Sequence, residues 1–127
     1  MTRTRARFDR PIFIRLRDLC LALPETRETL SWGHPNFQVG TRTFCTLEVV
    51  QSRPSIAFRV PPADVSRLER KKHFFTTPYG RGLWISRWLD DDTDWNELAA
   101  LITRSHEHVM SSNAPGRGRK GIEKRRP

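Results

Sequence analysis

The chain has 127 residues, the usual size of a single domain, and a formal net charge of +9. Hydrophobic residues make up 36% of it, and no apolar run approaches the roughly 20 residues that a membrane-spanning helix needs. No apolar stretch of the signal-peptide kind follows the basic N-terminus, and the two cysteines form no disulfide framework, so we expect a cytoplasmic protein without a membrane partner.

The first half of the chain predicts one helix followed by antiparallel strands. Apolar residues recur at helical spacing over 11–24, after an Asp9 that is suited to cap the helix. A short strand over 29–32 leads to a corner at 33–35, because Gly permits unusual backbone angles and Pro pushes the preceding residue into an extended conformation. Further strands are predicted by alternating apolar residues over 37–39, 44–50 and 55–60.

The second half predicts two helices with a strand between them. One helix opens at 61–64, where proline suits the first turn. A loop with aromatic anchors over 74–82 precedes a strand over 83–89, which we expect to be central because it is apolar on both faces. Asp94 and Glu97 match a capping box at the start of a last helix of about 15 residues.

This order of elements predicts an α+β fold: helix, three or four strands, helix, strand, helix. Helices outside a run of strands are typical of an antiparallel sheet with its helices packed on one face. Trp84 and Trp95 lie on apolar periodic faces, so we expect both to be buried. One domain is expected over 9–110, with a flexible basic N-terminus over 1–8 and a disordered basic tail over 111–127.

Several short motifs, taken in their order, resemble the MmcQ/YjbR family. They are Leu23-Pro24-Glu25-Thr26, Trp32-Gly33-His34-Pro35-Asn36-Phe37-Gln38-Val39, Phe44, Pro78-Tyr79-Gly80, Gly82-Leu83-Trp84-Ile85 and Asp94-Trp95-Asn96-Glu97-Leu98. The resemblance covers roughly residues 10–110 and implies a small fold similar to frataxin and CyaY, of the double-wing type. It also implies DNA binding, a function that rests largely on fold analogy.

Basic residues concentrate at the two ends of the chain. Residues 1–10 carry +3 and residues 114–127 carry +5, which leaves +1 for the remainder. The C-terminal tail resembles the Arg-Gly-Arg core of AT-hook peptides without their flanking prolines, and its candidate phosphate contacts are Arg117, Arg119 and Lys120. On the body, the candidate nucleic-acid contacts, for which solvated surface charge is the alternative, are Arg42, Arg53, Lys71, Lys72 and Arg81.

A second group of residues predicts a ligand site or a structural corner. It comprises Trp32, Gly33, His34, Pro35, Tyr79 and Trp84. His34 is either a ligand contact, because imidazole titrates near neutral pH, or a structural residue whose ring hydrogen-bonds to the backbone. Trp32 is either a stacking surface or a core residue.

The sequence shows no catalytic constellation and no metal motif. It contains no Cys-x-x-Cys or His-x-x-x-His pair, and its run of aspartates over 90–94 lacks the glycine and closing glutamate of a calcium loop. We therefore expect a monomeric, non-enzymatic protein without cofactor or metal, whose partner is DNA or another polyanion. The alternative is a small-molecule or protein-interaction module at Trp32, His34, Tyr79 and Trp84, favoured if the body's basic residues scatter around a concave aromatic pocket.

Overall fold

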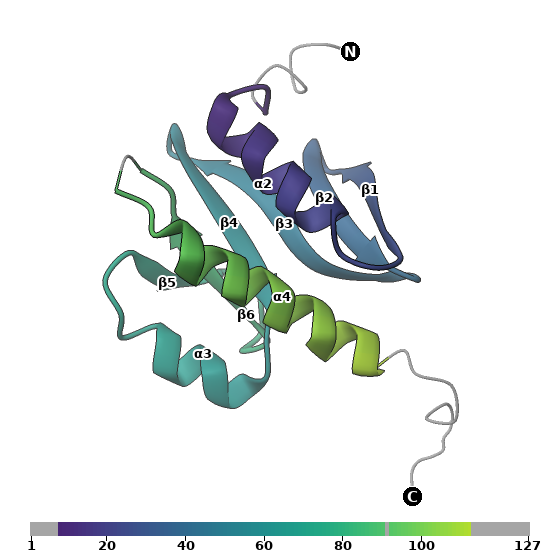
Figure 1. Cartoon of the computed structure of the whole chain (residues 1–127). Helices are drawn as coiled ribbons and strands as arrows, with labels where there is room; N and C mark the ends of the chain where they lie inside the picture. Colours follow the sequence, from purple (N-terminus) through teal and green to yellow (C-terminus); the bar gives the residue numbers. More distant parts are fainter. Residues whose placement is uncertain (1–7, 91, 113–127) are drawn as a thin grey trace, which may run out of the picture.

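Six antiparallel strands and three helices make up residues 8–90 and 92–112, the part of the chain that the computed structural model describes. This is the α+β architecture that the sequence predicts (Figure 1). In chain order the elements are α2 (Pro11–Leu21), β1 (Thr26–Ser31), β2 (His34–Val39), β3 (Arg42–Val50), β4 (Arg53–Arg59), α3 (Pro62–Leu68), β5 (Phe74–Thr76), β6 (Trp84–Trp88) and α4 (Trp95–Ser112). The sheet order is β1-β2-β3-β4-β6-β5.

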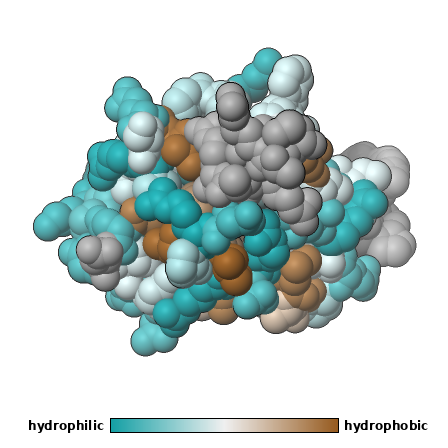
Figure 2. Space-filling model, turned by 90° about the horizontal axis from the view of Figure 1, so that it is seen from above, coloured by the Kyte–Doolittle hydropathy of each residue, from teal (hydrophilic) through white to brown (hydrophobic). Residues whose placement is uncertain are grey.

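The helices cover one face of the sheet and leave the other face open. Helix α4 lies across β3 and β4, α2 packs beside it over β1, and α3 packs against β5 and β6 (Figure 1). An ion pair of 2.6 Å between Arg104 Nε and Asp64 Oδ2 joins α4 to α3. No helix in the described residues is long and apolar enough to cross a membrane. The face seen from above is largely hydrophilic, with smaller hydrophobic patches between the polar residues (Figure 2).

Phenylalanine, not tryptophan, fills the core between the helices and the sheet. The side chains of Phe13, Phe37, Phe44 and Phe58 are fully buried. Cys20 and Cys45 are also buried, with 3.8 Å between their sulfur atoms. Trp84 and Trp95, expected to be largely buried, are partly buried, and Trp95 packs against the core cluster.

The corner of the first hairpin lies one residue earlier than predicted. Trp32 and Gly33 have φ values of 55° and 79°, and positive values at both central residues are what a type I′ turn requires. His34 and Pro35 therefore belong to β2, opposite Ser31 and Leu30. Gly33 adopts the unusual conformation that was expected of it, but Trp32 shares it.

The sequence predicts an N-cap residue for α2 and for α4, and only the second prediction is correct. Asp94 caps α4, because its Oδ1 accepts a hydrogen bond of 3.1 Å from the Glu97 amide. Asp9 does not cap α2: Arg10 occupies that position without a side-chain hydrogen bond, and Pro11 at the first helical position leaves no amide there to cap.

The aromatic loop predicted over 74–82 contains a short strand. Strand β5 pairs antiparallel with β6 and forms the edge of the sheet. Its three residues are too few to show an alternating pattern in the sequence. Strand β6 lies between β4 and β5 and is interior, in keeping with its apolar faces.

Candidate ligand-binding site

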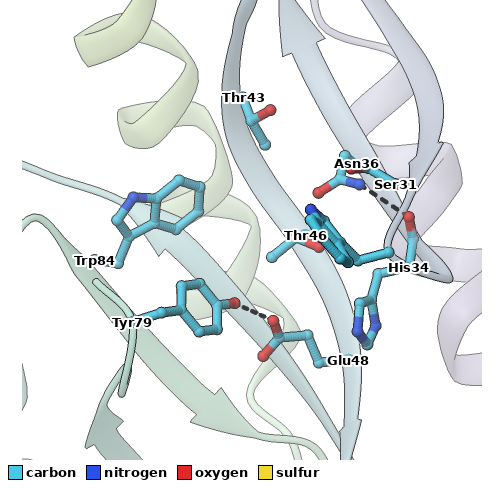
Figure 3. Close-up of a pocket in the computed structure, with 9 residues that line it drawn as sticks. Ser31, His34, Asn36, Thr43, Thr46, Glu48, Tyr79 and Trp84 are labelled. Carbon is cyan, nitrogen blue, oxygen red and sulfur yellow. Dashed lines mark hydrogen bonds between the residues drawn. The ribbon is translucent and has the colours of Figure 1, made fainter. Parts of the chain in front are cut away.

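The open face of the sheet carries a pocket of about 530 Å³ (Figure 3). It is lined by Ser31, Trp32, His34, Asn36, Thr43, Thr46, Glu48, Tyr79 and Trp84. Strand alternation places these side chains, since successive residues point to opposite faces of a sheet. Asn36 and Thr46 are cross-strand partners on the pocket side, whereas the next pair, Phe37 and Cys45, points into the core.

Three segments that are distant in the sequence build the walls. The tip of the β1–β2 hairpin contributes Trp32, the middle of β3 contributes Glu48, and the loop before β6 contributes Tyr79. Gly80 allows this loop to lie close to the sheet, because a Cβ at that position would meet the Cβ of Trp84 at 2.7 Å. The loop thereby holds the Tyr79 ring beside the pocket, next to the ring of Trp84 at the start of β6 (Figure 3).

Glu48 forms the charged floor of the pocket. Only 8% of the residue is exposed, and its Oε2 accepts a hydrogen bond from the Tyr79 hydroxyl (Figure 3). Partial desolvation of the Tyr79 hydroxyl, on a residue that is otherwise exposed, and this hydrogen bond to Glu48 raise the pKa of Tyr79 well above its ordinary value. No lysine, arginine or histidine in the described residues forms an ion pair with Glu48.

His34 presents an unsatisfied polar atom close to the pocket. Its Nδ1 is buried and has no hydrogen-bond partner in the part of the chain that is described. The backbone carbonyl of His34 accepts a hydrogen bond of 2.9 Å from Asn36 Nδ2, and its ring meets Phe8 edge-on at 6.0 Å between centroids. The ring is therefore placed by packing, and not by the backbone hydrogen bond that was the structural alternative for it.

Trp32 lies at the rim of the pocket and is almost completely exposed. With 95% of its surface accessible, it is no core residue, so that alternative from the sequence is wrong. Its positive φ comes from the hairpin turn and costs a bulky residue free energy. Neither its exposure nor its backbone conformation serves the packing of the fold.

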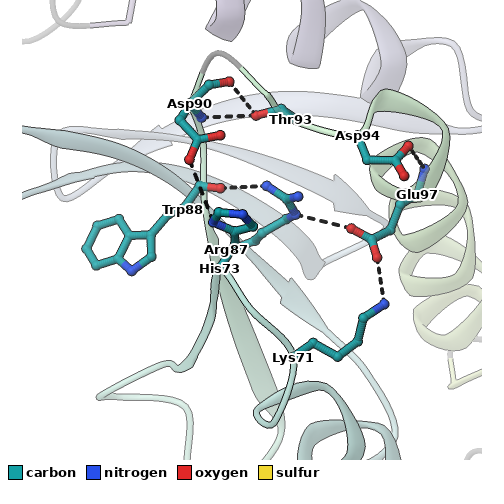
Figure 4. A network of polar contacts seen from close by, with 8 residues as sticks. All are labelled: Lys71, His73, Arg87, Trp88, Asp90, Thr93, Asp94 and Glu97. Carbon is teal, nitrogen blue, oxygen red and sulfur yellow. Dashed lines mark hydrogen bonds and ion pairs between the residues drawn. The ribbon is translucent and has the colours of Figure 1, made fainter.

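Two of the basic candidates on the body, Arg42 and Arg53, lie far apart. Arg42 begins β3, whereas Arg53 follows its other end, on the order of 25 Å along the strand, so these two candidates do not meet. The Arg53 guanidinium stacks on the Trp88 ring at 4.0 Å, and Lys71 Nζ lies 2.6 Å from Glu97 Oε2 on α4 (Figure 4). The other two body candidates, Lys72 and Arg81, are exposed. Arg117, Arg119 and Lys120 fall outside the described residues.

One group of side chains has the geometry to hold a metal ion. Ligand atoms of His73, Asp90 and Asp92 lie within 4.8 Å of one another, and His73 Nδ1 is 3.7 Å from Asp90 Oδ2 (Figure 4). A hydrogen bond with Asp92 raises the pKa of Asp90. The sequence indicated the aspartates but not the histidine, which comes from the turn before β5. Asp94 is not in this group, because it caps α4.

Sequence reasoning missed the polar floor of the pocket. Five polar residues line it and are not among the candidates that the sequence predicts: Ser31, Asn36, Thr43, Thr46 and Glu48. The available signal was in β3, where Thr46 and Glu48 alternate with the apolar Cys45 and Leu47. A charged residue in the middle of so apolar a strand indicates a buried polar site, because a buried charge needs a partner.

The comparisons with known proteins agree with this fold. The family model described as YjbR matches residues 21–108. A protein from Pseudomonas syringae is 16% identical, with a TM-score of 0.64 over 72% of this chain and 93% of that chain. Deinococcus radiodurans protein DR2400, which carries the family-model domain DUF419, is 21% identical, with a TM-score of 0.66 over 86% of this chain and 80% of that one. No curated protein matches the sequence.

Proposed function

The chain belongs to the YjbR family, and we propose that it is a binding module that holds a small organic ligand on the open face of its sheet. The supporting observation is that Trp32, His34, Tyr79 and Trp84 line one pocket of about 530 Å³. Small-molecule sites have volumes of roughly 300–1,000 Å³ and combine apolar walls with a few polar groups. The pocket has three aromatic rings at its walls and a carboxylate, an amide and hydroxyls at its floor.

The positions of the basic residues favour this proposal over DNA binding by the folded body. Arg42 and Arg53, the arginines beside the two hairpin turns, lie at opposite ends of β3, on the order of 25 Å apart along the strand. Arg53 is also engaged with Trp88, and Lys71 with Glu97.

Charge favours a second candidate function, weak binding of DNA or another polyanion. The whole chain carries +9, and the two ends supply +8 of it. Attraction of this kind is independent of base sequence and falls steeply with salt. It requires no pocket, so the two functions are separable by variants.

The pocket proposal is tested by ligand-observed NMR with a panel of small compounds. We expect some of them to bind the wild-type protein and to lose affinity by about tenfold in Trp32→Ala, as an exposed binding aromatic implies. Ile14→Ala is the matched control, because Ile14 is 45% exposed on α2, on the helix-covered side. The proposal is contradicted if no compound in the panel binds Trp32→Ala more weakly than Ile14→Ala. Recovery of the bound compounds unchanged after long incubation supports binding without turnover.

A further inference from the structure

We infer that the pocket accepts an organic cation, a substituted ammonium group that lies between the Trp32, Tyr79 and Trp84 rings and the Glu48 carboxylate. The inference rests on the proposed function and names the ligand class of that same pocket. Two independent observations carry it: an unbalanced buried charge and two unoccupied ring faces.

The first observation is the isolation of the Glu48 charge. Three buried residues of the described chain carry a full formal charge: Glu48, Asp64 and Arg87, at 8%, 8% and 3% exposure. Asp64 is paired with Arg104 at 2.6 Å, and Arg87 with Glu97 at 3.4 Å. Buried charges are normally paired, because an isolated charge loses its hydration without gaining a partner. Glu48 is thus the exception, and the space in front of it is the pocket.

Neighbouring polar groups leave this charge unbalanced. The Tyr79 hydroxyl donates to Oε2 of Glu48, while Oε1 has no partner in the described residues. Ser55, directly across from Glu48 on β4, also has a buried hydroxyl without a partner there. A hydroxyl donates a hydrogen bond but brings no positive charge. A ligand with a cationic group supplies what these neighbours do not.

The second observation concerns the four tryptophans. Trp95 carries the Arg15 guanidinium 3.9 Å from its ring centroid, and Trp88 carries that of Arg53 at 4.0 Å. These are the two tryptophans outside the pocket. The two that line it, Trp32 and Trp84, have no cation over their rings in the described residues. Indole faces attract cations more strongly than other aromatic side chains do, so the pocket presents two such faces free.

The backbone of Trp32 adds a reason for its position. A bulky residue with a φ of 55° and 95% exposure is unfavourable both sterically and in hydration. Strain of this kind concentrates at functional sites, and here it projects an indole at the rim of the pocket that Glu48 also lines. Tyr79, at 56% exposure, lies at the surface in the same way and completes the aromatic wall.

The experiment compares cations with neutral compounds of the same shape. Choline and 3,3-dimethylbutan-1-ol differ by one atom, a charged nitrogen or a neutral carbon, and benzyltrimethylammonium is paired with neopentylbenzene. We expect at least one cation to bind the full chain about tenfold or more tightly than its neutral partner, measured by NMR shifts of the indole protons. Glu48→Gln keeps the size and an acceptor for Tyr79, and we expect it to remove most of this preference while neutral compounds bind as before. Trp32→Ala weakens the cations and Ile14→Ala leaves them unchanged.

The results separate this inference from the proposed function. The inference of a cationic ligand is overturned if the pocket ligands are neutral or anionic. It is also overturned if the preference for cations survives in Glu48→Gln. In both cases the proposal of a binding module stands. A panel without any pocket ligand overturns both. A short peptide with one trimethylated lysine tests the source of the ammonium group: we expect it to bind no more tightly than choline, because the pocket has the volume of a small-molecule site. Tighter binding of the peptide assigns the cation to a partner protein.

Discussion

Glu48 and Tyr79 are 31 positions apart in the sequence, and the Tyr79 hydroxyl donates a hydrogen bond to the Glu48 carboxylate. This contact joins the loop between β5 and β6 to the middle of β3. It fixes one wall of the pocket against its floor, so the loop conformation and the environment of the carboxylate depend on each other.

We predict that Tyr79 ionises at a pH far above that at which an ordinary tyrosine ionises. Partial desolvation of its hydroxyl and the hydrogen bond to Glu48 raise the pKa of Tyr79, and this residue is the only tyrosine of the chain, so its absorbance at high pH reports on it alone. An ordinary tyrosine ionises near pH 10. The neutral phenol is favoured in the folded state, so its contribution to stability is complete below about pH 10 and is lost as the pH rises toward the folded-state pKa.

Two variants check the cause of this shift by ultraviolet titration. In Glu48→Gln the pKa of Tyr79 should fall toward the ordinary value, because the charged acceptor is gone. Glu107→Gln, an exposed change on α4, should leave the titration as it is. Ionisation of the folded wild-type protein near pH 10 is the result that contradicts the prediction.

Core truncation should be far more damaging on the helix side of the sheet than in the pocket. Phe58 is fully buried, and Phe58→Ala should lower the free energy of unfolding by about 3–5 kcal/mol. Trp84 is half-buried, so we expect Trp84→Ala to lower it by less than half as much. Urea denaturation gives both values, and equal losses for the two variants contradict this division between core and site.

The ion pair between Arg104 and Asp64 should make stability depend on acid pH. Its hydrogen bond from Arg104 is the main cause that holds the pKa of Asp64 below its ordinary value of 3.8. Because the folded-state pKa is the lower one, the stabilisation is present above the unfolded-state pKa and is lost as the pH falls through the folded-state pKa.

Asp64→Asn provides the test, by thermal unfolding between pH 3 and pH 7. The variant should be less stable than wild type at pH 7, by on the order of 1 kcal/mol, and the difference should shrink toward pH 3. Asp18→Asn, at an exposed position on α2, serves as the control and should follow the wild-type curve. A difference that stays constant with pH assigns the effect to packing.

Polyanion binding should come mainly from the ends of the chain. Deleting residues 114–127 removes +5, so we expect weaker duplex binding and a flatter dependence on salt. If the body reads DNA, Arg42→Ala with Arg53→Ala in the shortened protein should abolish what remains. A salt-titrated binding assay on duplex DNA decides, with the Trp32→Ala protein as a control that should bind DNA like wild type. Binding that vanishes on deletion alone shows that the folded body takes no part.

Local patterns in the sequence were sufficient for the helices and the class of fold. The helical spacing of Phe13, Leu16 and Cys20 placed α2, and the Asp94 cap placed the start of α4. The first hairpin shows the limit of prediction from local patterns. Its turn lies at Trp32 and Gly33, so His34 and Pro35 belong to β2 and not to the predicted corner. The pairing of Tyr79 with Glu48 has no local signal at all, since it depends on the β5–β6 loop folding over β3.

The alternation of side chains along β2 and β3 divides the residues of this protein into two sets with separate tasks. Phe37, Cys45 and Leu47 hold the sheet to its helices, while Asn36, Thr46 and Glu48, each one position away, face the pocket. A single-residue change in the second set alters the lining of the pocket and leaves the hydrophobic core intact. The same scaffold can therefore carry differently lined pockets by point substitutions at every second position, without a new fold and without an insertion.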